Sequence, residues 1–275
     1  MIRRQPRCIG LSRPAVRQAN RNRYYGSFTQ TIFSIFAKQC TRKREATMRF
    51  VMLGSGKTGA LVAEVATLRG HTVETIDERE NFKGAALSKQ RLAGVDAVID
   101  FTTPKAVMAN IEATVHAGAN MVVGTTGWYA EMPHVRNQVE RSGTGFIWAS
   151  NFSIGVNLFF AIVREGAKAL KYGYEGRICE THHIHKLDAP SGTAVSLGKT
   201  LEQFGGKKVP ISSIREGEVV GTHTVEFLSA ADKITLTHEA ENRRGFAEGA
   251  VRAAEWVKGK RGFYEFQEVF SELKG

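Results

Sequence analysis

The sequence predicts an α/β protein built on a parallel sheet and followed by a second α/β region. From Met48 onward, short β-rich runs alternate with amphipathic stretches, and the connections are short and marked by glycine. After Asn151 the alternation gives way to a long helical stretch, a histidine-rich segment and three closely spaced β-like runs. The first pattern is typical of parallel strands joined by helices, and the change of pattern predicts a second domain.

The net charge of +11 comes almost entirely from the N-terminal segment. Residues 1–47 hold eleven Lys and Arg against one acid, Glu45, so the other 228 of the 275 residues carry 27 basic and 26 acidic side chains. A nearly neutral body gives no reason to expect nucleic acid or a membrane surface as its partner. No run approaches the ~18 apolar residues of a membrane-spanning helix. Three cysteines are too few for a disulfide framework.

Residues 1–47 are predicted to be a basic extension outside the fold. The segment is rich in Arg, Gln, Asn, Ser and Thr and lacks the apolar core of a secretory signal. Three interpretations compete: an organellar transit peptide, a disordered nucleic-acid-binding arm, and sequence upstream of the true start codon. We favour translation from Met48, because Arg49–Gly54 directly after it has the pattern of a first strand, and we place a transit peptide second.

Five strands and three helices are predicted in alternation up to Asn151. Each strand is a short β-rich run, and each helix is an amphipathic stretch. The strands are Arg49–Leu53, Thr72–Ile76, Ala97–Asp100, Met121–Val123 and Phe146–Ala149. The helices are Thr58–Arg69, Ala106–Ala117 and Met132–Arg141.

The second region begins with a long helix and ends with a helix that is expected to return to the first domain. Its predicted helices are Gly155–Lys171, Ser191–Phe204 and Ala247–Lys258. Its predicted strands are Arg177–Thr181, Val209–Arg215, Thr222–Leu228 and Lys233–His238. The last three runs are close enough in sequence to pair antiparallel.

A glycine-rich loop between the first strand and the first helix predicts a dinucleotide site. The pattern Gly-x-Gly-x-x-Gly is formed by Gly54, Ser55, Gly56, Lys57, Thr58 and Gly59. The first glycine permits a tight turn, the second lets the backbone approach a pyrophosphate, and the third lets helix and strand pack closely. The spacing does not fit a Walker P-loop.

The end of the second strand supports the dinucleotide but leaves the choice of cofactor open. Asp77 ends that strand, where a carboxylate accepts hydrogen bonds from ribose hydroxyls. Asp77 or Glu78 favours NADH, whereas Arg79 could bind the 2′-phosphate of NADPH. Glu78 and Arg79 could also be solvated loop charges.

Three further strand ends carry small or hydroxyl residues. They are Asp100–Pro104, Gly124–Gly127 and Ala149–Phe152. In an open parallel sheet the ligand lies at the carboxyl ends of the strands, so these segments suit a nicotinamide ribose and its amide. Such residues also favour turns, but the coincidence of three favours function. The residues predicted to bind the cofactor here are Gly124, Thr125, Thr126, Ala149, Ser150, Asn151 and Phe152.

The densest group of ionisable side chains follows the strand Arg177–Thr181. If the strand continues in extended form, its alternation places His182, Ile184 and Lys186 on one face. A histidine and a lysine on one face could protonate or bind an anionic substrate. We interpret His185 as a surface or structural residue.

The helix that follows this segment could bind a carboxylate. Ser191 is a predicted N-cap, so the amides of Gly192 and Thr193 would point at an anion. A zinc site is the alternative for the histidines, but neither the HExxH pattern nor a cysteine partner is present, and the cationic Lys186 disfavours a metal. We therefore predict no metal.

The histidine-rich segment resembles the signature of the 4-hydroxy-tetrahydrodipicolinate reductase (dihydrodipicolinate reductase) family of the diaminopimelate–lysine pathway. That family carries the run Glu-x-His-His-x-x-Lys-x-Asp-Ala-Pro-Ser-Gly-Thr-Ala, which Glu180–Ala194 matches. Ile184 departs from the family, which commonly has a polar or basic residue there, so it receives no substrate role. The resemblance covers residues 48–275 and includes Asp100–Pro104, Gly124–Gly127, Asn151–Asn157, Gly221–His223, His238 and Arg244–Ala250.

The resemblance implies a role for each residue of the cluster. His182 would be the catalytic acid/base and Lys186 the second proton donor, while His183 with Gly192 and Thr193 would hold a small cyclic dicarboxylate. NADH or NADPH would deliver a hydride to this substrate, and an enzyme acid would protonate the resulting carbanion-like carbon. The reaction expected is reduction of 4-hydroxy-tetrahydrodipicolinate to tetrahydrodipicolinate.

The resemblance also implies a Rossmann-type sheet with an inserted α/β domain that binds substrate and builds a homotetramer. We predict an extension over 1–47, a dinucleotide-binding domain over 48–151, a substrate-binding domain over 152–245 and a C-terminal return over 246–275. The expected location is the cytoplasm, or a plastid or other organelle if residues 1–47 are a transit peptide. Neither nucleic acid nor membrane is expected as a partner.

Two rival functions remain at this point. Another two-domain NAD(P)-dependent dehydrogenase, acting on an amino-acid-like substrate, would share the same cofactor half. A redox-sensing or nucleic-acid-binding module would use the basic extension and would show affinity for nucleic acid that falls with salt. The segment His182–Thr193 favours the cyclic dicarboxylate over both.

Overall fold

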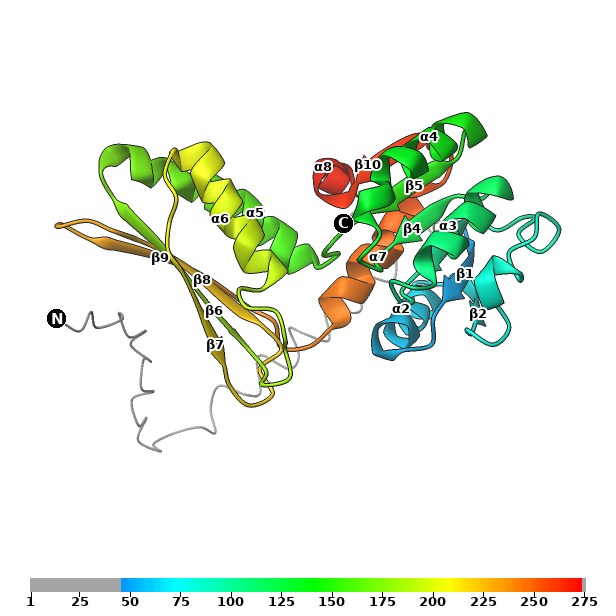
Figure 1. The fold of residues 1–275 in the computed structure, drawn as a ribbon, viewed down its shortest axis with the longest axis horizontal. Coiled ribbons are helices and arrows are strands. Elements are labelled where there is room, and N and C mark those ends of the chain that lie inside the picture. The colour runs from blue at the N-terminus through cyan, green and yellow to red at the C-terminus, as the bar shows by residue number, and fades with distance from the viewer. Residues whose placement is uncertain (1–45, 274–275) are drawn as a thin grey trace, which may run out of the picture. The chain divides into compact units, whose positions relative to one another are not determined.

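A computed structural model describes residues 46–273, which form an α/β fold with two sheets (Figure 1). The predicted extension lies almost entirely outside the described residues. Within the described range, six strands form an all-parallel sheet, called here the parallel sheet. Its strands are β1 (Arg49–Leu53), β2 (Thr72–Ile76), β3 (Ala97–Asp100), β4 (Met121–Val123), β5 (Gly145–Trp148) and β10 (Gly262–Glu265).

The strand order of the parallel sheet fixes where a ligand can bind. The order is β10-β5-β4-β3-β1-β2, so the chain runs one way from β1 to β2 and the other way from β3 onward. The loops after β1 and β3 therefore diverge and open a crevice at the carboxyl ends of these strands. The glycine-rich loop follows β1 and Phe101 follows β3, so both segments border this crevice.

Helices cover both faces of the parallel sheet and bury its apolar strands. One hydrophobic core includes α2 (Lys57–Leu68) and α7 (Arg244–Val257), and α8 (Phe266–Val269) packs at its edge. The other core includes α3 (Val107–His116) and α4 (Met132–Ser142). Strands buried on both faces explain why β3 and β4 consist almost wholly of apolar residues.

A second sheet follows, called here the mixed sheet, with β7-β6-β8-β9 as its described strand order. Helices α5 and α6 pack on one face of it around a third hydrophobic core (Figure 1). A short 3-10 helix, Ala167–Tyr172, continues α5. The elements are α5 (Ile154–Gly166), β6 (Glu175–His182), α6 (Gly192–Gly205), β7 (Ile211–Arg215), β8 (Thr222–Leu228) and β9 (Lys233–Glu239).

The expected pairing of the mixed sheet is wrong for one strand. β8 pairs antiparallel with β9 as predicted, but β7 pairs parallel with β6. The reason is α6, a crossover helix that carries the chain back to the end of the sheet where β6 began, so that β7 must run in the same direction. The sequence also did not predict β10 or α8.

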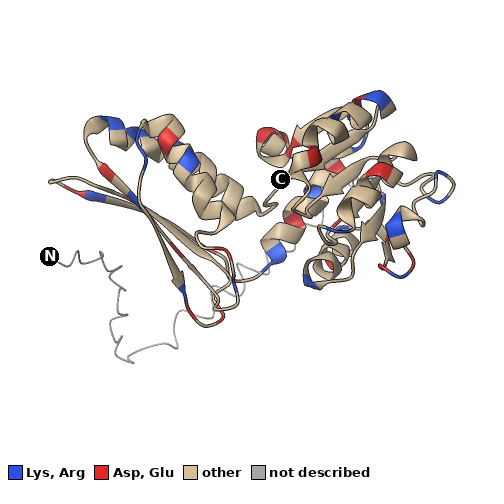
Figure 2. Cartoon of the chain, in the orientation of Figure 1, with Lys and Arg blue, Asp and Glu red and all other residues tan. Residues whose placement is uncertain are grey.

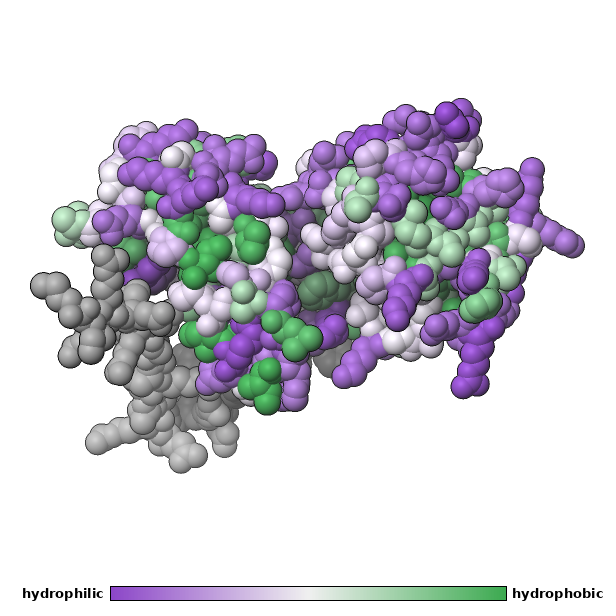
Figure 3. Space-filling model, viewed as in Figure 1, coloured by the Kyte–Doolittle hydropathy of each residue, from purple (hydrophilic) through white to green (hydrophobic). Residues whose placement is uncertain are grey.

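The surface of the described chain agrees with its nearly neutral charge. Basic and acidic residues are interspersed along the ribbon in Figure 2. On the face drawn in Figure 3, hydrophobic side chains lie scattered among mostly hydrophilic ones. Among the described residues, every helix is too short or too polar to cross a membrane.

Candidate active site

The glycine-rich loop is shaped by three glycines with different surroundings. Gly54 has φ +97, and a Cβ there would lie 2.5 Å from the carbonyl oxygen of Phe101. A Cβ on Gly59 would lie 2.0 Å from the carbonyl oxygen of Gly54. A Cβ on Gly56 would meet nothing within 4 Å, although this residue directly precedes α2. The first and third glycines are thus required by the fold, whereas the second leaves space beside the helix N-terminus for a ligand.

A shallow cavity of about 330 Å³ lies beside this loop. Of the predicted cofactor residues, those lining it are Gly56, Lys57, Thr58, Gly124, Thr125 and Thr126. Gly124 is required there because a Cβ would lie 2.3 Å from the ring of Phe101. The ends of β1, β3 and β4 therefore meet at one cavity, as expected for the carboxyl edge of a parallel sheet.

The Thr125 hydroxyl serves the fold of this edge. It donates to the buried Asp100 carboxylate at 2.6 Å, which also accepts from the Thr102 hydroxyl at 2.8 Å and from Asn110 at 2.7 Å. Burial raises the pKa of Asp100, although these hydrogen bonds oppose the rise. The cluster ties the ends of β3 and β4 to α3, so the Thr125 side chain positions its loop.

The remaining predicted cofactor residues lie apart from this cavity. Asp77 accepts the backbone N–H groups of Arg79 and Glu80 at 2.9 and 3.0 Å, and it is exposed together with Glu78 and Arg79. Ser55 is exposed on the glycine-rich loop. Phe152 is buried, with its ring against Phe101 and Phe266, and is a packing residue.

A larger cavity, of about 690 Å³, is lined by residues of both sheets. Two stretches that lie far apart in the sequence meet there: the chain after β5, and the chain from the turn after β6 to the start of α6. The cavity is therefore where the predicted chemistry and the predicted cofactor segments converge. The residues that were predicted to bind cofactor or substrate and that line this cavity are Thr126, Ala149, Ser150, Asn151, His182, His183, Lys186, Gly192 and Thr193.

The predicted alternation of His182, Ile184 and Lys186 is wrong. Strand β6 ends at His182, and the chain then turns, with the Lys186 N–H donating to the His183 carbonyl at 3.1 Å. Ile184 is 59% exposed and does not line the cavity. A turn, and not an extended strand, thus brings Lys186 back to the cavity that His182 lines.

The start of α6 has the predicted cap. The Ser191 side chain accepts the Ala194 N–H at 3.2 Å, and Gly192 and Thr193 line the cavity. The Asp188 carboxylate lies 2.7 Å from Lys186 Nζ. The hydrogen bond from Lys186 and then its charge hold the pKa of Asp188 below its usual range, against the effect of burial. A carboxylate is thus already bound where a substrate carboxylate was expected.

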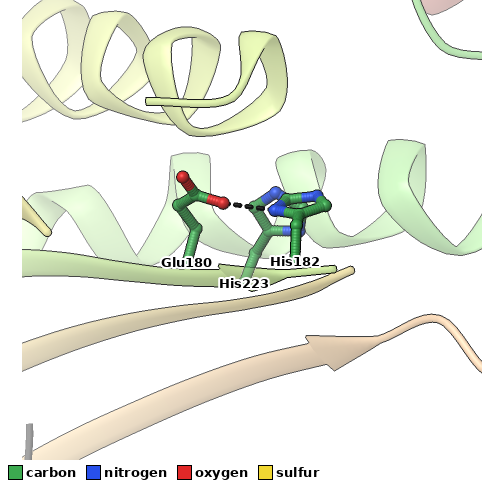
Figure 4. A group of neighbouring side chains, drawn as sticks. All are labelled: Glu180, His182 and His223. Atoms are coloured by element: carbon green, nitrogen blue, oxygen red, sulfur yellow. Dashed lines mark hydrogen bonds and ion pairs between the residues drawn. The ribbon is translucent and has the colours of Figure 1, made fainter. Parts of the chain in front are cut away.

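Glu180 and His223 lie beside His182 in a buried polar network (Figure 4). The Glu180 carboxylate, fully buried, is hydrogen-bonded to His182 Nδ1. The His223 ring packs edge-on against His182, and its Nε2 lies 3.2 Å from Ser191 Oγ. Burial lowers the pKa of His182 despite the opposing Glu180 charge, and burial lowers the pKa of His223 to about 4.

These three side chains could also ligate a metal ion, since their ligand atoms lie within 4.8 Å of one another. Arg215 Nη1 lies 3.0 Å from Glu180 and already supplies a positive charge there. Lys186 adds a second positive charge that His182 senses. Both charges favour a hydrogen-bonded network over a divalent ion, and the absence of a metal stays a prediction.

The sequence did not predict a role for Arg215 or Arg243. Arg215 lies on β7 and reaches Glu180 across the strand pairing. Arg243 lines both cavities. For Glu180 and His223, the sequence predicted no role beyond their place in the family's motifs. Glu180 bonds Arg215 on the neighbouring strand, and His223 bonds Ser191, which lies 32 residues earlier, so the order of residues along the chain carries no direct signal of these contacts.

Comparisons with known proteins match nearly all of the chain from residue 48 onward. The family model described as "Dihydrodipicolinate reductase, N-terminus" matches residues 48–152, and "Dihydrodipicolinate reductase, C-terminus" matches residues 155–270. A 4-hydroxy-tetrahydrodipicolinate reductase of Christiangramia forsetii is 37% identical over 242 residues, which cover 82% of this chain and 99% of the relative. One of Neisseria gonorrhoeae is 39% identical over 199 residues, covering 65% and 73%.

The fold is also that of a solved relative, the dipicolinate-bound dihydrodipicolinate reductase of Paenisporosarcina sp. TG-14. The TM-score is 0.66 at 23% identity, with 81% of this chain and 99% of that chain covered. The α/β fold class predicted from the sequence is therefore confirmed. The chain belongs to the dihydrodipicolinate reductase family and is an oxidoreductase of lysine and diaminopimelate biosynthesis that uses a nicotinamide cofactor.

Proposed function

We propose that His182 and Lys186 are the proton donors in the reduction of 4-hydroxy-tetrahydrodipicolinate to tetrahydrodipicolinate by NADH or NADPH. The single observation that carries this proposal is the larger cavity, which is lined by every residue predicted to act on or bind the substrate. Those residues are His182, His183, Lys186, Gly192 and Thr193.

The chain's own part in cofactor binding is to leave room for it and to orient it. When bound, a nicotinamide cofactor supplies the hydride. The open space beside Gly56 admits a phosphate to the N-terminus of α2, where backbone N–H groups attract anions. Thr126 lines both cavities and would stand beside the nicotinamide end.

His182 is suited to donate a proton into the cavity. Because its Nδ1 is hydrogen-bonded to Glu180, the proton for transfer would be held on Nε2. Burial lowers the pKa of His182, and a bound dicarboxylate would raise it again by its negative charge. The histidine would therefore become a better-populated acid when the substrate binds.

Lys186 and the start of α6 are suited to hold the carboxylates of the substrate. A substrate carboxylate would replace Asp188 at Lys186 Nζ and would reach the N-terminus of α6 at Gly192. The Thr193 hydroxyl lies 3.5 Å from the Asn151 amide on the other side of the cavity. His183 Nδ1 is buried without a hydrogen-bond partner among the described residues, so it could bind the second carboxylate.

The substitution His182→Gln tests the proposal, with His185→Gln as its matched control. His185 lies three residues away, but its side chain is 71% exposed. We expect His182→Gln to lower kcat by about 10²-fold or more, because a positioned acid contributes that much. Binding of NADPH, followed by its fluorescence, should not change. Unchanged turnover in His182→Gln would remove His182 from the mechanism.

The quaternary structure and location stay predictions. The family resemblance supports a homotetramer assembled through the mixed sheet, whose strand β9 is largely exposed along its length. Light scattering on the purified protein measures this mass directly. The cytoplasm stays the predicted location, and nucleic acid and membranes stay unexpected as partners.

A further inference from the structure

We propose that Glu180 and Arg215 form a positioning unit for both proton donors, in which Glu180 orients His182 and Arg215 holds Glu180 together with the backbone around Lys186. The inference rests on the proposed function, since it takes His182 and Lys186 as the donors. Neither Glu180 nor Arg215 lines the larger cavity, so they are positioning residues and not catalytic ones.

Glu180 is fixed on both of its carboxylate oxygens. Its Oε2 is hydrogen-bonded to His182 Nδ1, while its Oε1 accepts the Ser191 N–H at 3.3 Å and Arg215 Nη1 at 3.0 Å. Burial alone would raise the pKa of Glu180, but hydrogen bonds from Ser213, Arg215 and His182 outweigh burial and lower it. Glu180 is therefore a carboxylate that can accept from His182.

A carboxylate at Nδ1 determines which histidine nitrogen faces the substrate. It keeps the proton of neutral His182 on Nδ1, so Nε2 is the nitrogen that gains and loses the transferred proton. The His182 ring also packs closely against Gly221, since a Cβ at Gly221 would lie 2.9 Å from His182 Nε2. Only glycine leaves room for the ring in this orientation.

Arg215 joins the carboxylate to the turn that carries the second donor. Its Nε donates to the Lys186 carbonyl at 3.3 Å, and its Nη2 donates to the Asp188 carbonyl at 2.5 Å. Its Nη1 also donates to its neighbour's carbonyl, that of Ile214, at 2.7 Å. The planar fork of an arginine can make these divergent bonds at once, whereas the single ammonium group of a lysine cannot.

The titratable and charged groups that face His182 come from three strands and one turn. Glu180 lies on the same strand, Arg215 on β7, His223 on β8 and Lys186 in the turn. Glu180 favours the protonated histidine, and both cations disfavour it. Removal of the Glu180 charge must therefore shift the titration of His182 to lower pH.

The first experiment compares Glu180→Gln with Glu226→Gln over the pH profile of kcat/KM. Glu226 makes a similar pair with Arg177 across β8 and β6, at 2.5 Å, and lies outside both cavities described here. We expect Glu180→Gln to move the alkaline fall of kcat/KM down by about one pH unit. Glu226→Gln should leave the profile where it is.

The second experiment compares Arg215→Lys with Arg177→Lys. We expect Arg215→Lys to lower kcat by about tenfold to a hundredfold, the effect of misplacing reacting groups by a fraction of an ångström to an ångström. The KM for the cofactor should stay constant, because the glycine-rich loop does not touch this unit. Arg177→Lys should change neither constant.

A measurement on the unaltered protein keeps the proposal testable if a variant fails to fold. Long-range 1H–15N NMR of labelled histidine should show neutral His182 with its proton on Nδ1. A proton on Nε2, or a pH profile that Glu180→Gln leaves unshifted, would overturn the positioning unit. These results would leave the proposed function intact, whereas full activity of His182→Gln would reject the proposed function itself.

Discussion

His223 shows how strongly a single environment can act on a residue of this site. It lies buried between β6 and β9, and its Nδ1 has no hydrogen-bond partner among the described residues. Burial, followed by the charge on His182, lowers its pKa to about 4. The residue is therefore neutral at pH 7, and it limits the positive charge that surrounds His182.

This environment predicts an acid-labile fold. The unfolded chain binds a proton on His223 below pH ~6.5, whereas the folded chain does so only near pH 4, so protonation favours the unfolded state between these values. The free energy of unfolding should fall as the pH drops through this window, by on the order of 3 kcal/mol in all. Urea titrations from pH 7 to pH 4 measure the slope.

The matching variant isolates the contribution of His223. His223→Asn should flatten the dependence on pH below 6.5, while His185→Asn, at an exposed position, should leave it as steep as before. A slope that His223→Asn does not change would place the acid sensitivity elsewhere, for example at His238, whose pKa burial also lowers.

At the level of the elements, the glycine-rich loop separates a folding role from a binding role. Gly59→Ala would place a Cβ 2.0 Å from a backbone carbonyl, and Gly56→Ala would place one in open space. We expect Gly59→Ala to lower the free energy of unfolding by about 3 kcal/mol or more, because neither partner can move aside easily. Gly56→Ala should leave it unchanged.

On cofactor binding, Gly56→Ala is the variant expected to have the larger effect. Gly56→Ala should weaken the binding of NADH and NADPH about tenfold, because its methyl group occupies the space through which a pyrophosphate approaches the helix. Thermal melts and fluorescence titrations measure the two effects separately. Equal stability of the two variants, or full affinity in Gly56→Ala, would contradict this division.

The elements also show what the sequence could and could not predict. Strands β1 to β4 were predicted to the residue, because β1, β3 and β4 are short, buried, mostly apolar runs, and the partly buried β2 stands out by its β-branched residues. β10 was missed, because its four residues lie between two helices and carry no alternation. The parallel pairing of β7 was missed as well, because pairing depends on the crossover and not on the strand's own residues.

The site, like the fold, could be predicted only in part from the sequence. The motif Glu180–Ala194 predicted which side chains line the cavity, because family members share those residue types in that order. It could not predict the turn after His182, since one of the hydrogen bonds that hold this turn runs from the Ile184 N–H to the Gly217 carbonyl on a later segment. Arg215 was missed for the same reason: its partners are distant in sequence.

At the scale of the whole chain, we propose that residues 1–47 are not needed for the activity. The family model begins at residue 48, and the Christiangramia forsetii relative is covered over 99% of its length by 82% of this chain. A chain that starts at Met48 should keep the kcat and Tm of the full chain. A mass spectrum of the native protein shows where it begins. Loss of activity on deletion of residues 1–47 would assign them a role in the fold or the site.

The most direct test of the account is the oxidation of NADH and NADPH by the full chain with freshly made 4-hydroxy-tetrahydrodipicolinate, followed at 340 nm. We expect turnover with at least one cofactor, lost in His182→Gln and retained in His185→Gln. A chelator in the assay should leave the rate unchanged, as expected of a network built from Glu180, His182 and His223 without a metal. No oxidation of either cofactor would contradict the account.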